Sequence, residues 1–116
     1  MRIAYIVGPY RAETYKHRQE NIAKAAIVAK EFWKRGYAVI CPHTNSANFD
    51  GIVSDKVFLE GYLEILLLLD HFVDNLVVAL PGWISSSGSR NEISQAKAFD
   101  LEILYLTEKE YAAFTK

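Results

Sequence analysis

Hydrophobic residues in this chain gather in short apolar runs that alternate with longer segments of helical spacing. Apolar runs that end at glycine, proline or polar residues are typical of strands, and they occur over residues 3–7, 37–41, 75–80 and 103–106. Apolar residues three or four positions apart predict helices over about residues 13–35, 55–73, 89–99 and 108–114. Strands and helices therefore alternate along the whole chain.

This alternation predicts an α/β fold, in which a parallel sheet of about four strands carries helices on both faces. We expect a single domain over residues 1–116, a flavodoxin-like or Rossmann-like three-layer sandwich. Right-handed crossovers favour the strand order 2-1-3-4, in which the chain reverses direction between the first and third strands. The turns after these two strands, residues 8–11 and 81–92, then meet at the carboxyl edge of the sheet, where such folds bind ligands.

Composition narrows the class of partner. The chain of 116 residues is 51% hydrophobic and 23% charged, which suits one globular domain with a hydrophobic core. A formal charge of −1 disfavours binding to extended nucleic acid. The single Cys41 suits a reducing cytoplasm, no signal-peptide pattern opens the chain, and the longest aliphatic run, residues 65–69, is too short for a bilayer. We therefore expect a cytoplasmic protein with a small-molecule ligand and no membrane partner.

The second predicted helix is apolar on nearly every side over its later half, through Phe58, Leu59, Tyr62, Leu63 and residues 65–69. One face of a sheet cannot cover such a helix, so a second surface must bury the remainder. In a small domain this surface is commonly another subunit. The pattern predicts a homodimer or a higher homo-oligomer.

The segment from Pro81 to Glu92 follows a buried strand and contains several serines and two glycines. The S-x-x-E spacing of Ser89 and Glu92 predicts a helix that begins at Ser89, and the positive end of this helix is expected to keep Glu92 ionised. Small residues leave backbone N–H groups free to approach a sugar or a phosphate. In an alternative interpretation, Glu92 only completes a capping box with Ser89.

Four segments carry a family resemblance: YIVGPY (5–10), GYAVICPH (36–43), DNLVVALPGW (74–83) and SGSRNEISQA (87–96). Together they resemble the nucleoside 2-deoxyribosyltransferase-like superfamily, particularly its small phage and bacterial members of unassigned function. The resemblance implies that Glu92 is a nucleophile that attacks C1 of a deoxyribose and displaces the base. Water or a second base then resolves the covalent glycosyl-enzyme with retention. We expect an N-glycosidic-bond transferase or hydrolase with no cofactor and no metal.

The resemblance also implies a binding site for a nucleoside or a nucleoside 5′-monophosphate. Arg11 is placed where a cation pairs with a 5′-phosphate, and Ser86 and Gly88 match hydroxyl and N–H donors. In an alternative interpretation, Arg11 pairs with Glu13 or Glu20 on the surface. The expected substrate-binding residues are Tyr5, Gly8, Pro9, Tyr10, Arg11, His43, Pro81, Gly82, Trp83, Ser86, Ser87, Gly88 and Ser89.

The group that assists departure of the base is the third expected catalytic element. Family members usually place an aspartate in the second helix, where this chain has Tyr62. The interval to the third strand is about one helical turn longer than usual, so Asp70 is an alternative to Tyr62. The missing aspartate also favours a rival function, a noncatalytic nucleotide-binding module with the same pocket.

Several other side chains have two interpretations each. Trp83 either stacks on a base or packs against an oligomer partner. Cys41 and His43 lie two positions apart, but Pro42 between them argues against a thiol–imidazole pair, so His43 is better interpreted as a pocket residue. The three histidines, His17, His43 and His71, show no metal-ligand spacing. The polar residues Asn45, Asn48 and Asp50 fit either a lid over the base or a solvated loop.

Overall fold

The computed structural model describes residues 1–72 and 74–115, and its α/β architecture is the predicted one. The sheet has four parallel strands in the predicted order β2-β1-β3-β4. The strands are β1 (Ile3–Val7), β2 (Ala38–Ile40), β3 (Asn75–Ala79) and β4 (Glu102–Tyr105). The helices are α1 (Tyr15–Lys34), α2 (Pro42–Asn45), α3 (Asp55–Phe72), α4 (Ser87–Ala98) and α5 (Glu108–Ala113), with a 3₁₀ turn η1 at Trp83–Ser85.

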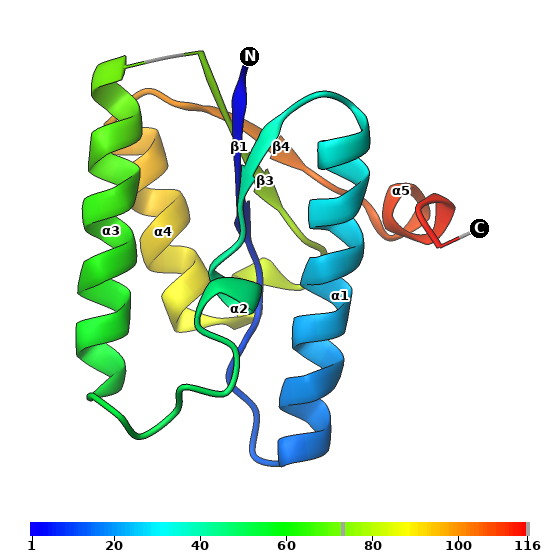
Figure 1. Cartoon of the computed structure of the whole chain (residues 1–116), viewed down its shortest axis with the longest axis vertical. Helices are drawn as coiled ribbons and strands as arrows, with labels where there is room; N and C mark the ends of the chain where they lie inside the picture. Colours follow the sequence, from blue (N-terminus) through cyan, green and yellow to red (C-terminus); the bar gives the residue numbers. More distant parts are fainter. Residues whose placement is uncertain (73, 116) are drawn as a thin grey trace.

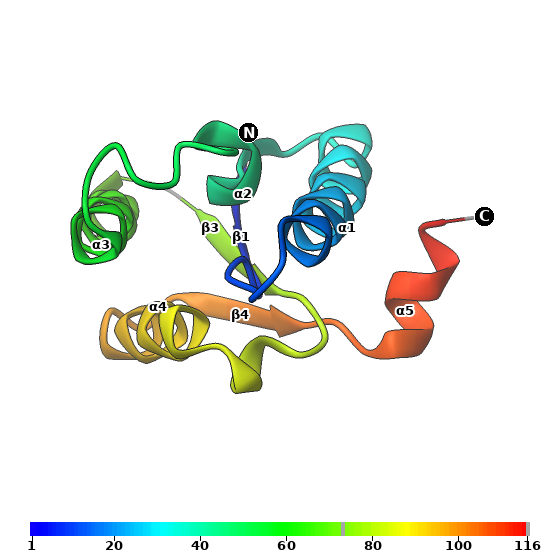
Figure 2. The ribbon, with the colours of Figure 1, turned by 90° about the horizontal axis from the view of Figure 1, so that it is seen from below.

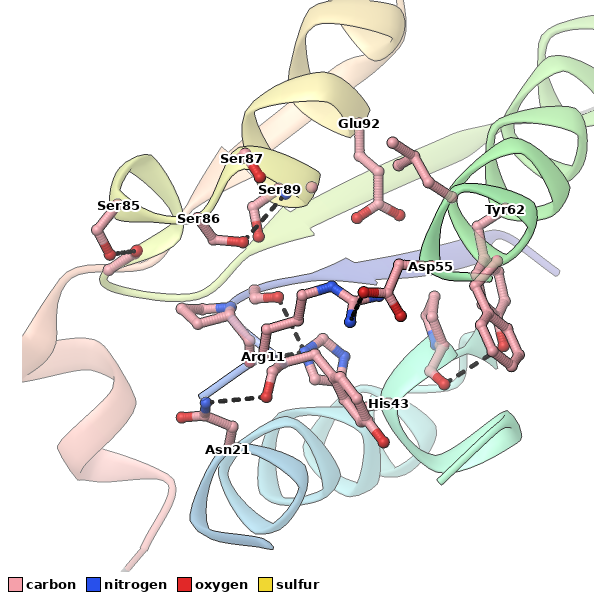
Figure 3. A pocket seen from close by; sticks show the side chains of 18 of the residues that line it. Arg11, Asn21, His43, Asp55, Tyr62, Ser85, Ser86, Ser87, Ser89 and Glu92 are labelled. Carbon is pink, nitrogen blue, oxygen red and sulfur yellow. Dashed lines mark hydrogen bonds and ion pairs between the residues drawn. The ribbon is translucent and has the colours of Figure 1, made fainter. Parts of the chain in front are cut away.

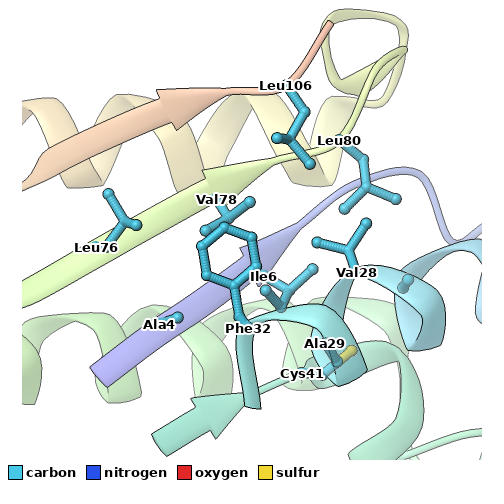
Figure 4. Packing of buried hydrophobic residues seen from close by; sticks show 11 residues of the cluster. Ala4, Ile6, Val28, Ala29, Phe32, Cys41, Leu76, Val78, Leu80 and Leu106 are labelled. Atoms are coloured by element: carbon cyan, nitrogen blue, oxygen red, sulfur yellow. The ribbon is translucent and has the colours of Figure 1, made fainter. Parts of the chain in front are cut away.

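Helices cover both faces of the sheet, as Figures 1 and 2 show, with α1 and α5 on one face and α3 and α4 on the other. In the first layer, Phe32 and Val28 of α1 pack against Ile6 of β1 and Val78 of β3 (Figure 4). Leu80 and Leu106, each just beyond the end of a strand, complete this core. Side chains that alternate along β1 and β3 thus supply two separate cores.

The second core lies under α3 and α4. Tyr5 and Val77 point to this face of the sheet, where Leu66 of α3 and Ile93 of α4 pack against them. Leu66 and Leu69 are buried within the single chain, whereas Leu68 faces outward with 57% of its surface exposed. The chain itself therefore buries part of the apolar surface on which the oligomer prediction rests, and it leaves Leu68 exposed.

Two boundaries differ from the predictions in ways that matter for function. The segment after β2, predicted as a loop from Pro42, begins with the short helix α2, and proline suits the first position of a helix because no partner is needed for its nitrogen. Helix α4 begins at Ser87, two residues before the predicted start at Ser89. The predicted last residue of the second helix, 73, lies outside the described residues. None of the described helices is long and apolar enough to cross a bilayer.

Candidate active site

A cavity of about 910 Å³ opens at the carboxyl edge of the sheet (Figure 3). Its walls come from the turn after β1, from α2 and the loop that follows, from the first turns of α3, and from the segment between β3 and α4. All of these segments follow strands β1, β2 and β3, which are neighbours in the sheet. The cavity therefore lies at the crevice that the strand order predicted.

Two glycines allow the β1 and β3 turns to approach each other. A Cβ on Gly8 would lie 3.1 Å from the Cβ of Leu80, so a larger residue there would push the two turns apart. Gly82 has a φ of +87°, a left-handed conformation that glycine adopts without strain, and a Cβ there would lie 3.8 Å from the ring of Pro9. The predicted ligand-binding residues Gly8, Pro9, Pro81 and Gly82 all line the cavity.

The alternative interpretation, in which Glu92 only completes a capping box with Ser89, is wrong. Ser86 is the N-cap of α4, and its hydroxyl accepts a hydrogen bond of 3.3 Å from the backbone N–H of Ser89. Glu92 is consequently the sixth residue of the helix, past its first turn. Its side chain is free of any capping role and points into the cavity (Figure 3).

The carboxylate of Glu92 is held by Tyr5. The phenol of Tyr5 donates a hydrogen bond of 2.5 Å to Oε2 of Glu92. No hydrogen bond within the described part of the chain uses the other carboxylate oxygen, Oε1. Tyr5 is fully buried and does not line the cavity, so its predicted contact with the ligand is corrected to a positioning role behind Glu92.

Burial governs the ionisation of this pair. Although part of Glu92 faces the cavity, the protein surrounds its carboxyl group closely, and this burial raises its pKa to about 7 while the Tyr5 hydrogen bond lowers it. The expectation that the helix end keeps Glu92 ionised did not allow for this burial, and the helix dipole acts mainly within the first turn, which ends before Glu92. Burial and the neighbouring Glu92 also raise the pKa of Tyr5, so its phenol remains a proton donor.

Ser89 lies one turn before Glu92 on the same side of α4. Its residue is only 1% exposed, it lines the cavity, and its hydroxyl has no hydrogen-bond partner among the described residues. A buried hydroxyl without a partner is costly, and the cavity is the place from which a ligand can supply one. Ser86, Ser87 and Gly88 also line the cavity, at the N-terminus of α4.

Arg11 lines the cavity and forms an ion pair with Asp55, with 2.6 Å between Nη1 and Oδ2. Neither surface partner considered from the sequence, Glu13 or Glu20, is used. Asp55 was not recognised as a site residue. The signal was available, because a helix that follows a parallel strand and its loop begins near the carboxyl edge, and Asp55 is the first residue of α3.

His43 is buried at the inner end of the cavity. Its Nε2 lies 2.9 Å from the carbonyl oxygen of Gly8 and 3.1 Å from that of Pro9, so this nitrogen carries the proton and donates. Burial lowers the pKa of His43, which favours the neutral ring. His43 thus fixes the turn after β1 and forms no pair with Cys41, whose thiol is buried and has a raised pKa for the same reason.

The polar loop after α2 is attached to α1 and the first turn. The Tyr10 hydroxyl donates to Asp50 at 2.6 Å and accepts from the backbone N–H of Asn48 at 3.2 Å. The Asn21 side chain donates to the backbone carbonyl of Tyr10 at 3.2 Å, which holds that residue in place. Tyr10 and Asp50 line the cavity, so this loop forms a wall of the site.

The two residues considered for the acid, Tyr62 and Asp70, lie in different places. Tyr62 lines the cavity, where its hydroxyl lies 2.7 Å from the Ser46 hydroxyl and accepts from Asn45 at 3.0 Å. Asp70 is exposed, lies two turns further along α3 and does not line the cavity, so its placement in the site is corrected. Helix α3 begins beside the cavity at Asp55 and ends at Phe72, so Asp70 lies near the end of the helix that is remote from the cavity, as the course of α3 in Figure 1 shows.

Trp83 also lies outside the cavity. It packs against Tyr105 with ring centroids 5.5 Å apart, beside the core under α4. The predicted stacking of Trp83 on a base is therefore not supported. Within residues 1–72 and 74–115, no group of three or more His, Cys, Asp or Glu side chains is arranged to hold a metal ion.

Comparisons with known proteins give a family and no activity. No curated protein matches this chain. One family model, described as Domain of unknown function (DUF4406), matches residues 2–105, from the first strand to the end of the last. Because the match covers nearly the whole chain, including every segment that forms the cavity except the start of α5, the chain belongs to the family of this domain of unknown function.

Proposed function

We propose that this protein cleaves or exchanges the N-glycosidic bond of a (deoxy)nucleoside or nucleoside 5′-monophosphate, with Glu92 as the nucleophile. The observation that carries the proposal is the carboxylate of Glu92, which faces the cavity and is bonded by Tyr5 on one oxygen only. A carboxylate with one oxygen fixed and the other available has the form that glycosyl transfer requires.

In the proposed reaction, the available oxygen of Glu92 attacks C1′ of the sugar while the C1′–N bond breaks. The bonding pair leaves with the base, which then takes up a proton, and an ester joins Glu92 to the sugar. Attack by water or by a second base on C1′ releases the carboxylate and inverts the centre again, so the overall outcome is retention, and the proton that the attacking group loses to solvent balances the one that the departing base took from solvent. Neither step requires a metal or an organic cofactor.

The pKa of about 7 supports this role at neutral pH. A substantial fraction of Glu92 is ionised there. The ionised carboxylate lies in a poorly solvated environment, where its attraction to the positive charge that develops on the sugar is strong. The Tyr5 hydrogen bond fixes the direction of the carboxylate without neutralising it.

The walls of the cavity suit the rest of a nucleotide. At the N-terminus of α4, the backbone N–H groups of Ser87 and Gly88 precede the first intrahelical bonds, and such a helix end favours a phosphate. Arg11 supplies a cation in the same cavity. Phe58 and Leu59 of α3 add apolar lining against which a base can pack.

A second candidate function is a noncatalytic nucleotide-binding module, and Tyr62 favours it. The hydroxyl of Tyr62 already interacts with Ser46 and Asn45, so its observed contacts are those of a structural residue. Without an acid near the leaving base, cleavage depends on bases that depart readily. This candidate predicts binding without base release.

Incubation with a panel of deoxynucleosides and their 5′-monophosphates distinguishes the two functions. Chromatography should reveal free base with the wild-type protein and a loss of at least about a thousandfold with Glu92→Gln, because removal of a nucleophile abolishes the covalent route. A thermal melt checks that the variant is folded. Activity that survives in Glu92→Ala would reject Glu92 as the nucleophile, and binding without release would favour the noncatalytic module.

The proposal includes a cytoplasmic homo-oligomer. The basis is narrower than the sequence indicated, since Leu68 and Val57 on the outer side of α3 are exposed among charged residues such as Glu60 and Glu64. Light scattering at micromolar concentration should show a dimer or larger species. Leu68→Lys should weaken that association, and a wild-type monomer would remove this part of the proposal.

A further inference from the structure

The ion pair of Arg11 and Asp55 is formed between two residues that line the cavity. Figure 3 shows the two side chains facing each other in the space between Glu92 and His43. Arg11 comes from the turn after β1 and Asp55 from the start of α3, so the pair bridges two separate walls. In this 2.6 Å contact, the guanidinium of Arg11 is already paired with the carboxylate of Asp55, although the proposed function needs that cation for a ligand.

The pair is readily exchanged. The side chain of Arg11 is 53% exposed and that of Asp55 is 65% exposed. Among the described residues, neither side chain makes a further hydrogen bond or ion pair. Because solvent screens an exposed pair and two flexible side chains must be ordered to form it, such a pair contributes little to the stability of the fold.

Asp55 and Arg11 can each form other favourable interactions when the ion pair opens. Asp55 is the first residue of α3, where the helix dipole and the free N–H groups of the first turn stabilise a carboxylate in water. Arg11 then presents its full planar fork of donors, which matches the oxygens of a phosphate. Asp50, the nearest other acid of the polar loop, is already bonded by Tyr10 and paired with Arg18, so it does not replace Asp55.

We infer that Asp55 is a specificity-determining residue, which holds Arg11 in the free protein and releases it only to an anionic group that binds Arg11 better than a carboxylate does. A phosphate dianion has more charge and more acceptor oxygens than Asp55, whereas a ligand carboxylate is its equal and a neutral nucleoside offers nothing. The site therefore selects a phosphorylated ligand against weaker anions. This inference rests on the proposed nucleotide ligand but is independent of its cleavage.

A double-mutant cycle tests the inference by calorimetric titration. The proteins are the wild type, Asp55→Asn, Arg11→Gln and the double variant, and the probes are the deoxynucleoside 5′-monophosphates, the matching deoxynucleosides and acetate. Asp55→Asn should tighten monophosphate binding about two- to fivefold, the size expected for the loss of one competing exposed pair. Deoxynucleoside affinity should not change, and acetate binding should become detectable at lower concentration.

The coupling to Arg11 is the decisive result. The gain from Asp55→Asn should disappear when Arg11→Gln is already present, because no cation then remains to be released. Glu64→Gln is the matched control, since Glu64 is an exposed acid of the same helix that does not line the cavity. It should leave monophosphate affinity unchanged.

Several outcomes overturn the inference. They are weaker or unchanged monophosphate binding in Asp55→Asn, a gain that persists with Arg11→Gln, an equal gain in Glu64→Gln, or no monophosphate binding in any variant. The proposed function fails by a different result, namely bound nucleotide from which the wild type releases no base. The two failures are thus read from separate measurements.

Discussion

Arg2 at the amino edge of the sheet contacts four groups of the protein, whereas Arg11 at the carboxyl edge contacts one. Arg2 pairs with Glu102 at 2.5 Å and with Asp74 at 3.3 Å, and it donates to the hydroxyl of Tyr37 and the backbone carbonyl of Asn75, both at 3.3 Å. These contacts join the segments at the starts of three strands. A multiply bonded arginine of this kind stabilises the fold.

The carboxyl edge has the opposite character. There, Arg11 has a single exposed partner, Glu92 has one bonded oxygen, and the hydroxyl of Ser89 has no partner among residues 1–72 and 74–115. Arg2 at the amino edge forms its bonds within the protein, whereas these groups around the cavity remain available to a ligand. Polar groups that line a cavity without using their full bonding capacity favour a ligand site there, because the fold gains nothing from leaving them unpaired.

Glu92→Gln gives the largest effect that the comparison predicts for stability. The pKa of Glu92 is raised to about 7 from 4.5, so its contribution to stability is complete below about pH 4.5 and is lost as pH rises through about 7. A glutamine does not ionise. Between pH 4 and pH 8, the variant should therefore gain about 3 kcal/mol in free energy of unfolding relative to the wild type.

Urea denaturation across this pH range measures the effect, with Glu64→Gln as the control because Glu64 is an exposed acid on α3. The control should follow the wild type at every pH. A constant difference between Glu92→Gln and the wild type would show that the carboxyl group is solvated normally and that this edge is not unusual.

Tyr5→Phe tests whether the Tyr5 hydrogen bond tunes the same carboxylate. The bond stabilises the ionised form, so its loss should raise the pKa of Glu92 further. The pH dependence of kcat/KM for base release should move to higher pH, while activity at high pH recovers. Activity lost equally at all pH values would instead indicate that Tyr5 only supports the fold.

How much of this arrangement the sequence predicts depends on the range of the interaction. The alternation of strands and helices, with right-handed crossovers, predicted the strand order correctly, and that order placed the segment that contains Glu92 at the edge where the cavity lies. The start of α4 was misplaced because Ser86 and Ser89 both resemble an N-cap, and local propensity does not choose between them. The bond between Tyr5 and Glu92 spans 87 positions and exists only once β1 lies beside β3 and under α4.

The same distinction explains the errors on α3. The sequence left the position of the acid open between Tyr62 and Asp70, and only the course of α3 past the cavity shows that Tyr62 lines it while Asp70 does not. The partner of Arg11 was sought among residues near in sequence, yet Asp55 lies 44 positions away on another wall. Contacts across a cavity follow from topology rather than from spacing.

Substituting Arg2 and Arg11 in turn separates effects on stability from effects on ligand binding. Arg2→Ala should lower the free energy of unfolding by about 1 to 2 kcal/mol, because it removes the ion pairs with Asp74 and Glu102 together with the hydrogen bonds that Arg2 donates. Arg11→Ala should leave stability nearly unchanged but weaken a nucleoside monophosphate about ten- to a hundredfold. Denaturation and calorimetry measure the two quantities. Equal affinity of Arg11→Ala and the wild type for every monophosphate would direct the proposal to free nucleosides.

Ser89→Ala is the smallest and most local test of the difference between the edges. The hydroxyl of Ser89 is buried, faces the cavity and has no partner among the described residues, so its removal relieves a desolvation cost, and alanine is also the better helix former. The free variant should be about 1 kcal/mol more stable than the wild type and should bind the ligand more weakly. Ser94→Ala, an exposed serine of the same helix, controls for helix propensity. If Ser89→Ala were less stable than the wild type, the hydroxyl would already have a structural partner such as bound water, and its place in the ligand site would have to be withdrawn.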